Sequence, residues 1–171
     1  MAQLVAALQL YYEIIHPALP NPAKHIKLPK KEVRYPDVLS EDEVRRIFDA
    51  VSNLKHRLLL MLVYSAGLRV SEVVSLKTTD LDFDRRMIKV RQGKGAKDRY
   101  VMLSSSIAEF YRQYRSSIMI RDWLFPGADS GSHLSTRSAQ AVFYAAVEKA
   151  GIMKDVSIYS LRHSFATHLL E

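Results

Sequence analysis

Five of the six prolines lie between positions 17 and 36, and this cluster constrains the fold more than any other feature. Proline fixes φ and lacks a backbone N–H, so it interrupts helices and central strands. The same segment has no helical or strand period, and it is rich in cations: Lys24, His25, Lys27, Lys30, Lys31 and Arg34. We therefore expect an extended basic linker over residues 18–36, with a short piece before it (residues 1–17) and one compact domain after it (residues 37–171).

Helical periodicity dominates the rest of the chain. Residues 4–16 repeat apolar side chains at helical spacing before Pro17, and Ser40 with Glu43 forms a capping box that opens a helix at the start of the compact domain. Further helices are predicted over 55–65, 70–76, 106–117, 135–150 and 160–170. Alternating patterns over 87–91 and 100–103 predict a β-hairpin with a long basic tip. The fold class is therefore mainly α with a small antiparallel β-sheet (α+β).

Charge and composition narrow the possible partners and chemistries. The 171 residues contain 25 Lys and Arg against 18 Asp and Glu, so the formal net charge at pH 7 is 25 − 18 = +7 with His neutral. Nucleic acid is the commonest anionic partner of a basic compact domain. The absence of cysteine excludes disulfides, thiol catalysis and Cys-type zinc sites. The longest apolar run, residues 58–64, is far shorter than the ~20 residues of a membrane helix, so we expect no membrane partner.

The first motif that could carry chemistry is the segment from Gly67 to Glu72. Its glycine turn leads into a short helix with Arg69 and Glu72 three residues apart. Arg69 offers a planar fork that fits two phosphate oxygens, at a helix end that favours an anion. The alternative is a simple ion pair between Arg69 and Glu72 at the start of the helix.

The second motif is the hairpin tip, residues 92–99. Two glycines let Lys94 project, and Lys97 and Arg99 add positive charge. The tip lacks the Gly-x-x-x-x-Gly-Lys-Ser/Thr spacing of nucleotide hydrolases and joins two strands. Such a finger suits contact with a DNA backbone or proton delivery to a leaving oxygen. A merely solvated charged loop is the alternative.

The third motif runs from Tyr159 to His163 and opens the last helix. Tyr159 and Arg162 lie three residues apart, so they share one helix face. Alternatively, Tyr159 packs in the core and Arg162 pairs with a carboxylate. His163 and His168 are five apart and point in different directions, which argues against a metal pair. No Gly-x-Ser-x-Gly elbow supports a serine hydrolase.

Together the three motifs supply two arginines, a loop lysine, a carboxylate and a hydroxyl group without a set of metal ligands. Two arginine forks can hold the non-bridging oxygens of a phosphodiester while a lysine protonates the departing oxygen. These groups could serve metal-free phosphoryl transfer on nucleic acid.

Three segments in the same order and spacing resemble the tyrosine recombinase, or phage integrase (Xer-like), family. They are Ala66-Gly-Leu-Arg-Val-Ser-Glu72, Gly93-Lys-Gly-Ala-Lys-Asp-Arg99 and Leu161-Arg-His-Ser-Phe-Ala-Thr-His-Leu-Leu170. The resemblance implies the catalytic-domain fold of that family over residues 37–171. It also implies that residues 1–17 hold the last helix of an N-terminal core-binding domain.

The resemblance also implies residue roles. Arg69 and Arg162 clamp the scissile phosphate, Glu72 supports the site, and Lys94 is the general acid. A tyrosine attacks the phosphate and leaves a 3′-phosphotyrosyl link with a free 5′-hydroxyl, without metal or other cofactor. The implied partners are duplex DNA and homologous subunits in a synaptic tetramer, in the cytoplasm. The candidate DNA-contacting residues are Lys24, Lys27, Lys30, Lys31, Arg34, Lys97, Arg99 and His163.

The sequence departs from the family pattern at two points. The family usually has His three residues before the second arginine, whereas this chain has Tyr159. Tyr159 is a candidate catalytic residue that can donate a hydrogen bond but is a poor base at neutral pH. The motif with the nucleophilic tyrosine should follow Leu170, so we expect a C-terminally truncated catalytic domain that does not cleave DNA alone. One alternative is a non-catalytic duplex DNA-binding module that keeps the phosphate clamp. Another is a general nucleic-acid-binding protein whose motifs are only surface charge.

Overall fold

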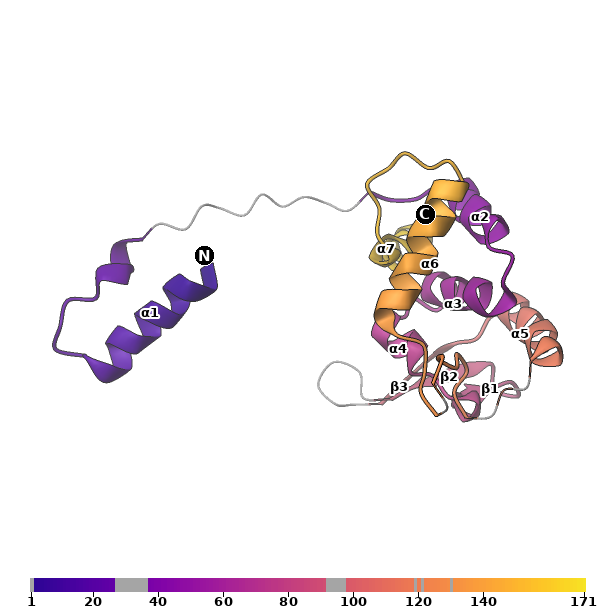
Figure 1. The fold of residues 1–171 in the computed structure, drawn as a ribbon, viewed down its shortest axis with the longest axis horizontal. Helices are drawn as coiled ribbons and strands as arrows, with labels where there is room; N and C mark the ends of the chain where they lie inside the picture. Colours follow the sequence, from indigo (N-terminus) through magenta and orange to yellow (C-terminus); the bar gives the residue numbers. More distant parts are fainter. Residues whose placement is uncertain (1, 27–36, 92–97, 119, 121, 130) are drawn as a thin grey trace. The chain divides into compact units, whose positions relative to one another are not determined.

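The computed structural model describes residues 2–26, 37–91, 98–118, 120, 122–129 and 131–171. The chain divides into two compact units, Met1–Tyr35 and Pro36–Glu171 (Figure 1). In the described part of the chain, no helix is long and apolar enough to cross a membrane.

The first unit consists of helix α1 (Ala2–Ile15) and a short 3₁₀ helix η1 (Pro22–His25) that folds back on it. The Asn21 side chain accepts a hydrogen bond from the Ala23 amide (3.0 Å) and donates to the Gln9 carbonyl (3.3 Å). Gln9 Nε2 in turn donates to the Ala23 carbonyl (3.1 Å), and Ala23 is buried. The expectation of an extended chain is therefore wrong for residues 22–25. Pro22 opens η1, where a proline is tolerated because its missing N–H has no partner in the first turn.

The second unit contains most of the helices and the sheet. Its elements are, in order, α2 (Glu41–Ala50), α3 (Leu54–Ser65), α4 (Val70–Val74), η2 (Thr78–Asp80), β1 (Leu81–Asp82), β2 (Met87–Val90), β3 (Arg99–Met102), α5 (Ser105–Ser117), α6 (Thr136–Lys149) and α7 (Ile158–His168). The three strands form an antiparallel sheet in the order β1-β2-β3, with Ile88 opposite Val101 and Val90 opposite Arg99. The predicted mainly helical fold with a small antiparallel sheet is confirmed.

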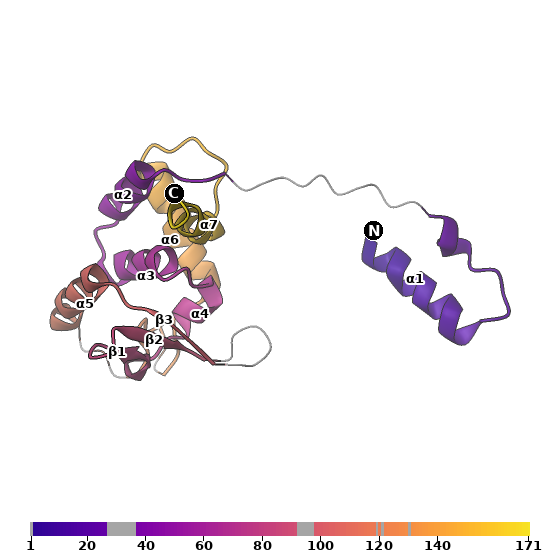
Figure 2. The same ribbon diagram turned by 180° about the vertical axis from the view of Figure 1, so that it is seen from behind.

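Helix α3 is the centre of the core. Figures 1 and 2 show it surrounded by α2, α5, α6 and α7. A helix enclosed on most sides needs apolar residues around most of its circumference, which explains its nearly continuous apolar run. The buried members of that run are Leu58, Leu59, Leu60, Leu62 and Val63.

Local sequence signals fix the ends of several helices. The predicted capping box is present: Ser40 Oγ accepts from the Glu43 amide, and the Ser40 amide donates to Glu43 Oε2 (2.7 Å). Helix α7 begins two residues earlier than predicted, so Tyr159 lies in its first turn. The amide of Leu39 donates to the buried Ser164 hydroxyl (2.9 Å), which ties the start of this unit to α7.

Gly67 brings the start of α4 close to α7. It has φ +56°, a left-handed conformation that favours glycine, and it ends α3. A Cβ atom at this position would lie 2.9 Å from Cδ1 of Phe165 in α7. The turn between α3 and α4 therefore needs glycine for two reasons: the left-handed backbone conformation and the close contact with Phe165. This close approach places the first and third motifs of the sequence together.

Candidate active site

Glu72 is the organising residue of the candidate site. Its side chain is 8% exposed and lies in the first turn of α4. Glu72 Oε2 accepts from the Arg69 amide (2.8 Å), and Oε1 accepts from Arg69 Nη1 (2.8 Å). The ion pair considered for the first motif is present. The carboxylate also takes up a backbone amide at the start of α4, so Arg69 must act on an anion through its side chain, which is 39% exposed.

Arg99 reaches the same carboxylate from the start of β3. Its Nη1 donates to Glu72 Oε1 (2.9 Å) and its Nη2 donates to Oε2 (2.8 Å), a bidentate pair. Sequence reasoning assigned Arg99 to DNA contact, but the structure places its guanidinium group on Glu72. The alternation of side chains along β3 could have predicted that Arg99 points inward. Arg99 shares a face with Val101 and Leu103, which point toward the core, whereas Tyr100 and Met102 are exposed.

Arg162 approaches the carboxylate from α7. Its Nη1 lies 3.8 Å from Glu72 Oε2, which is within ion-pair range but too long for a hydrogen bond. That nitrogen is buried, and it has no hydrogen-bond partner among the described residues. Buried polar groups normally have a partner, so Arg162 has an unused donor in the site.

The charges of this cluster are unbalanced. Three guanidinium groups face one carboxylate, which gives 3 − 1 = +2. Burial acts to raise the pKa of Glu72, but hydrogen bonds from Arg99 and Arg69 outweigh it and lower the pKa to about 2. Burial lowers the pKa of Arg162, and the charge of Arg69 lowers it further. An anion beside Arg162 would relieve this repulsion and use its free donor.

The arrangement fits a phosphate group. Arg69 and Arg162, which are 93 residues apart in sequence, both lie at Glu72 and keep partly exposed side chains. Two guanidinium groups held in place can bind the non-bridging oxygens of a phosphodiester and stabilise the charge that develops during substitution at phosphorus.

Tyr159 is not packed in the core, so that part of the alternative for the third motif is wrong, whereas the expected pairing of Arg162 with a carboxylate is present at Glu72. The Tyr159 side chain is 55% exposed in the first turn of α7. His163 is also exposed. His168 Nδ1 instead lies 2.9 Å from the Tyr64 hydroxyl, a contact the sequence did not reveal. Within the described ranges, no group of three or more His, Asp or Glu side chains could hold a metal ion.

Ion pairs fix both ends of the hairpin loop. Lys94 and Lys97 lie outside the residues that the structure describes, as do Lys27, Lys30, Lys31 and Arg34, while Lys24 is exposed in η1. Before the loop, Arg91 Nε lies 2.6 Å from the buried Asp80 carboxylate, and Lys89 lies 3.1 Å from Asp98. After it, Arg99 binds Glu72. The loop therefore starts and ends on anchored strands, one of them bound directly to the site.

Comparison with known proteins gives consistent matches. The family model described as "Phage integrase family" matches residues 37–171. The chain is 44% identical over 168 residues to the putative integrase/recombinase y4qK of Sinorhizobium fredii, covering 98% of this chain and 54% of that protein. The chain thus spans about half the length of this relative.

Solved structures are also similar. The crystal structure of XerA recombinase matches with a TM-score of 0.71 and 31% identity, covering 97% of this chain and 60% of that one. The XerH site-specific recombinase, in a pre-cleavage complex with its difH substrate, matches with a TM-score of 0.66 and 26% identity. That match covers 81% of this chain and 44% of XerH.

Proposed function

Because the chain belongs to the phage integrase family of tyrosine recombinases, we propose that it forms much of the catalytic domain of a site-specific DNA recombinase. The observation that carries this proposal is the convergence of Arg69, Arg99 and Arg162 on Glu72, with a buried donor of Arg162 left over. Glu72 balances only one of the three positive charges, and an anion bound at the cluster would relieve the remaining repulsion.

In the proposed mechanism, Arg69 and Arg162 bind the two non-bridging oxygens of the scissile phosphate. A tyrosine hydroxyl loses its proton to water as it attacks phosphorus, the bond from phosphorus to the 5′ oxygen breaks, and Lys94 gives its own proton to that leaving oxygen. A 3′-phosphotyrosyl link and a free 5′-hydroxyl result, and the reverse attack by another 5′-hydroxyl rejoins the strand. Glu72 and Arg99 position Arg69 without touching the DNA.

We assign the attacking tyrosine to a part of the protein outside these 171 residues. The match to only 54% of the y4qK relative supports a longer protein. Tyr159 is a hydrogen-bond donor in this scheme, not the nucleophile, since no carboxylate or histidine is hydrogen-bonded to its hydroxyl among the described side chains.

The proposed substrate is duplex DNA, bound by homologous subunits that act as a tetramer. The formal charge of +7 favours a phosphate backbone, and the similar XerH is described as bound to its difH substrate. Contacts to the backbone are proposed for Lys24, Lys27, Lys30, Lys31, Arg34, Lys97 and His163.

The test uses the full-length protein with a nicked duplex that traps the covalent intermediate. Arg69→Ala and Arg162→Ala should each lower covalent complex formation by roughly 100-fold or more, because each removes a donor to the charged transition state. DNA affinity in a gel-shift assay should fall by less than about tenfold, since many other phosphates remain bound.

Arg45→Ala is the matched control, because Arg45 pairs only with the exposed Asp42 among described residues. It should leave both measurements unchanged. Covalent complex that persists in both site variants would overturn the catalytic proposal. Binding without any covalent complex, even in the unaltered protein, would establish the non-catalytic DNA-binding alternative instead.

A further inference from the structure

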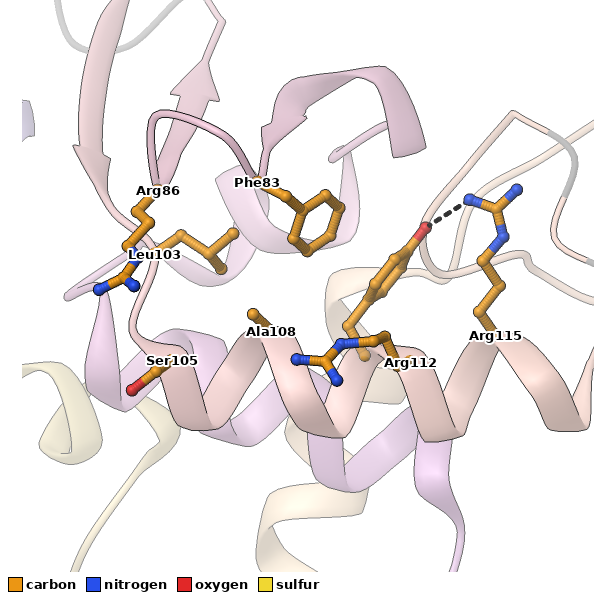
Figure 3. A pocket seen from close by; sticks show the side chains of 8 residues that line it. Phe83, Arg86, Leu103, Ser105, Ala108, Arg112 and Arg115 are labelled. Carbon is orange, nitrogen blue, oxygen red and sulfur yellow. Dashed lines mark hydrogen bonds between the residues drawn. The ribbon is translucent and has the colours of Figure 1, made fainter.

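A pocket separate from the candidate active site lies between the turn before β2 and helix α5 (Figure 3). Its volume is about 490 Å³, which is within the usual range for ligand pockets, roughly 300–1,000 Å³. It shares no residue with the arginine cluster around Glu72. The strand register also separates the two: Met87 pairs with Met102 at the pocket end of the hairpin, and Val90 pairs with Arg99 at the other end.

The floor of this pocket is apolar and firmly held. Phe83 and Leu103 point from the sheet side toward Ala108 on α5 (Figure 3). Leu103 is buried, and the Phe83 ring stacks on the buried Tyr111 with centroids 5.1 Å apart. The Leu103 amide also donates to the Arg86 carbonyl (2.8 Å), which closes the turn beneath the pocket. Phe83 is 40% exposed, so an apolar group placed here would cover apolar surface that is now in contact with water.

The rim is strongly cationic. Arg86, Arg112 and Arg115 line it, and no Asp or Glu does so. Arg115 Nη1 makes one long contact with the Tyr111 hydroxyl (3.5 Å), but Arg86 and Arg112 have no carboxylate partner among the described residues. The nearby Asp82 instead pairs with Arg85. The pocket therefore combines an apolar floor with three arginines and no carboxylate in its lining. A ligand that is both anionic and partly apolar would complement it.

The turn also holds Arg86 in an unusual conformation. Its φ of +53° lies in the left-handed region, which is uncommon for a residue with a side chain. Strain of this kind persists where the surrounding structure imposes it. The Arg86 side chain lies at one edge of the pocket, next to Leu103 (Figure 3). The turn therefore places the exposed Arg86 side chain beside the pocket.

We propose that this pocket binds an acidic peptide segment of a partner protein. One apolar side chain of that peptide lies on the Phe83, Leu103 and Ala108 floor, and flanking carboxylates pair with Arg86 and Arg112. A DNA duplex fits less well, because its bases are stacked inside and its phosphates would use the arginines while leaving the floor empty. Arginine and aromatic side chains contribute much of the binding energy in protein interfaces, and this pocket is lined by both kinds. This binding site does not depend on the proposed catalytic function.

The experiment measures fluorescence anisotropy of a labelled short peptide that has one leucine flanked by aspartate and glutamate. Arg112→Glu should weaken its binding at least tenfold by reversing a rim charge. Ala108→Trp should do the same by filling the floor without changing charge. A peptide with alanine in place of leucine should also bind more weakly to the unaltered protein.

Arg137→Glu is the matched control, because Arg137 is exposed on α6 and the charge change is the same. It should alter peptide affinity by less than about twofold, and circular dichroism should show that each variant is folded. Equal losses in Arg112→Glu and Arg137→Glu would overturn the proposal in favour of non-specific attraction. Absence of peptide binding, or loss of duplex DNA binding as the sole effect of Arg112→Glu and Ala108→Trp, would overturn it too.

Discussion

Protonation of Glu72 should weaken the ion pairs that hold the arginine cluster together and so destabilise the fold. The folded protein lowers the pKa of Glu72 from its ordinary 4.5 to about 2. A carboxyl group with a lowered pKa stabilises the fold fully above its unfolded pKa, and this stability is lost as pH falls through the folded pKa. The Glu72 contribution, on the order of 3 kcal/mol, should therefore be complete above about pH 4.5 and should disappear toward pH 2.

Urea denaturation across this pH window measures the effect. Glu72→Gln cannot titrate, so its free energy of unfolding should depend less on pH than that of the unaltered protein between pH 4.5 and 2. The matched control is Asp42→Asn, because Asp42 is exposed and pairs only with Arg45 among described residues. Identical pH dependence in Glu72→Gln and the unaltered protein would show that the arginines do not lower the pKa of Glu72 in the folded state.

Arg99 should behave as a structural partner of Glu72. Arg99→Ala removes two charge-assisted hydrogen bonds from a buried carboxylate, so the free energy of unfolding should fall by roughly 1–3 kcal/mol. Arg45→Ala should cost less than about 0.5 kcal/mol, as expected for an exposed pair. Unchanged stability of Arg99→Ala together with a weaker salt dependence of DNA binding would restore the role that the sequence predicted for Arg99.

At the scale of elements, the approach of α4 to α7 depends on Gly67. Gly67→Ala adds a Cβ atom 2.9 Å from Phe165 and forces a side chain into a left-handed conformation, so stability should fall by roughly 2–4 kcal/mol. Gly151→Ala controls for the backbone term, because Gly151 has φ +66° and a Cβ there meets nothing within 4 Å. Equal changes in the melting temperature of the two variants would show that the Phe165 contact is unimportant.

Most elements of this fold could be predicted because their signals are local. The Ser40–Glu43 box, the apolar spacing in α2 and α6, and the alternation in β2 and β3 involve neighbours a few residues apart. The 3₁₀ helix at residues 22–25 was not predicted, because Asn21 and Gln9 supply contacts that proline content does not reveal. The pairing of Arg99 with Glu72 also escaped prediction, since it needs the sheet register and the position of α4.

At the scale of the whole molecule, the positively charged side chains form two groups that differ in how they are held. The arginines at Glu72 are held in fixed ion pairs and provide a net +2 at one place. The cations between positions 24 and 34 are spread along a segment rich in proline and need no shared geometry to neutralise phosphates. Under the proposed function, the first group acts on a single phosphate, and the second provides affinity for any DNA sequence.

This division predicts that the two groups affect different measurements. Changing Lys30, Lys31 and Arg34 together to alanine should lower the slope of log affinity against log salt by about 2–3, since each lost phosphate contact removes about 0.9. Cleavage within the bound complex should not change, because the arginines at Glu72 remain. Changing Arg45, Arg137 and Lys149 to alanine removes the same charge from exposed positions of the second unit and controls for net charge. A slope that changes equally in both triple variants would mean that the basic segment has no special role in binding DNA.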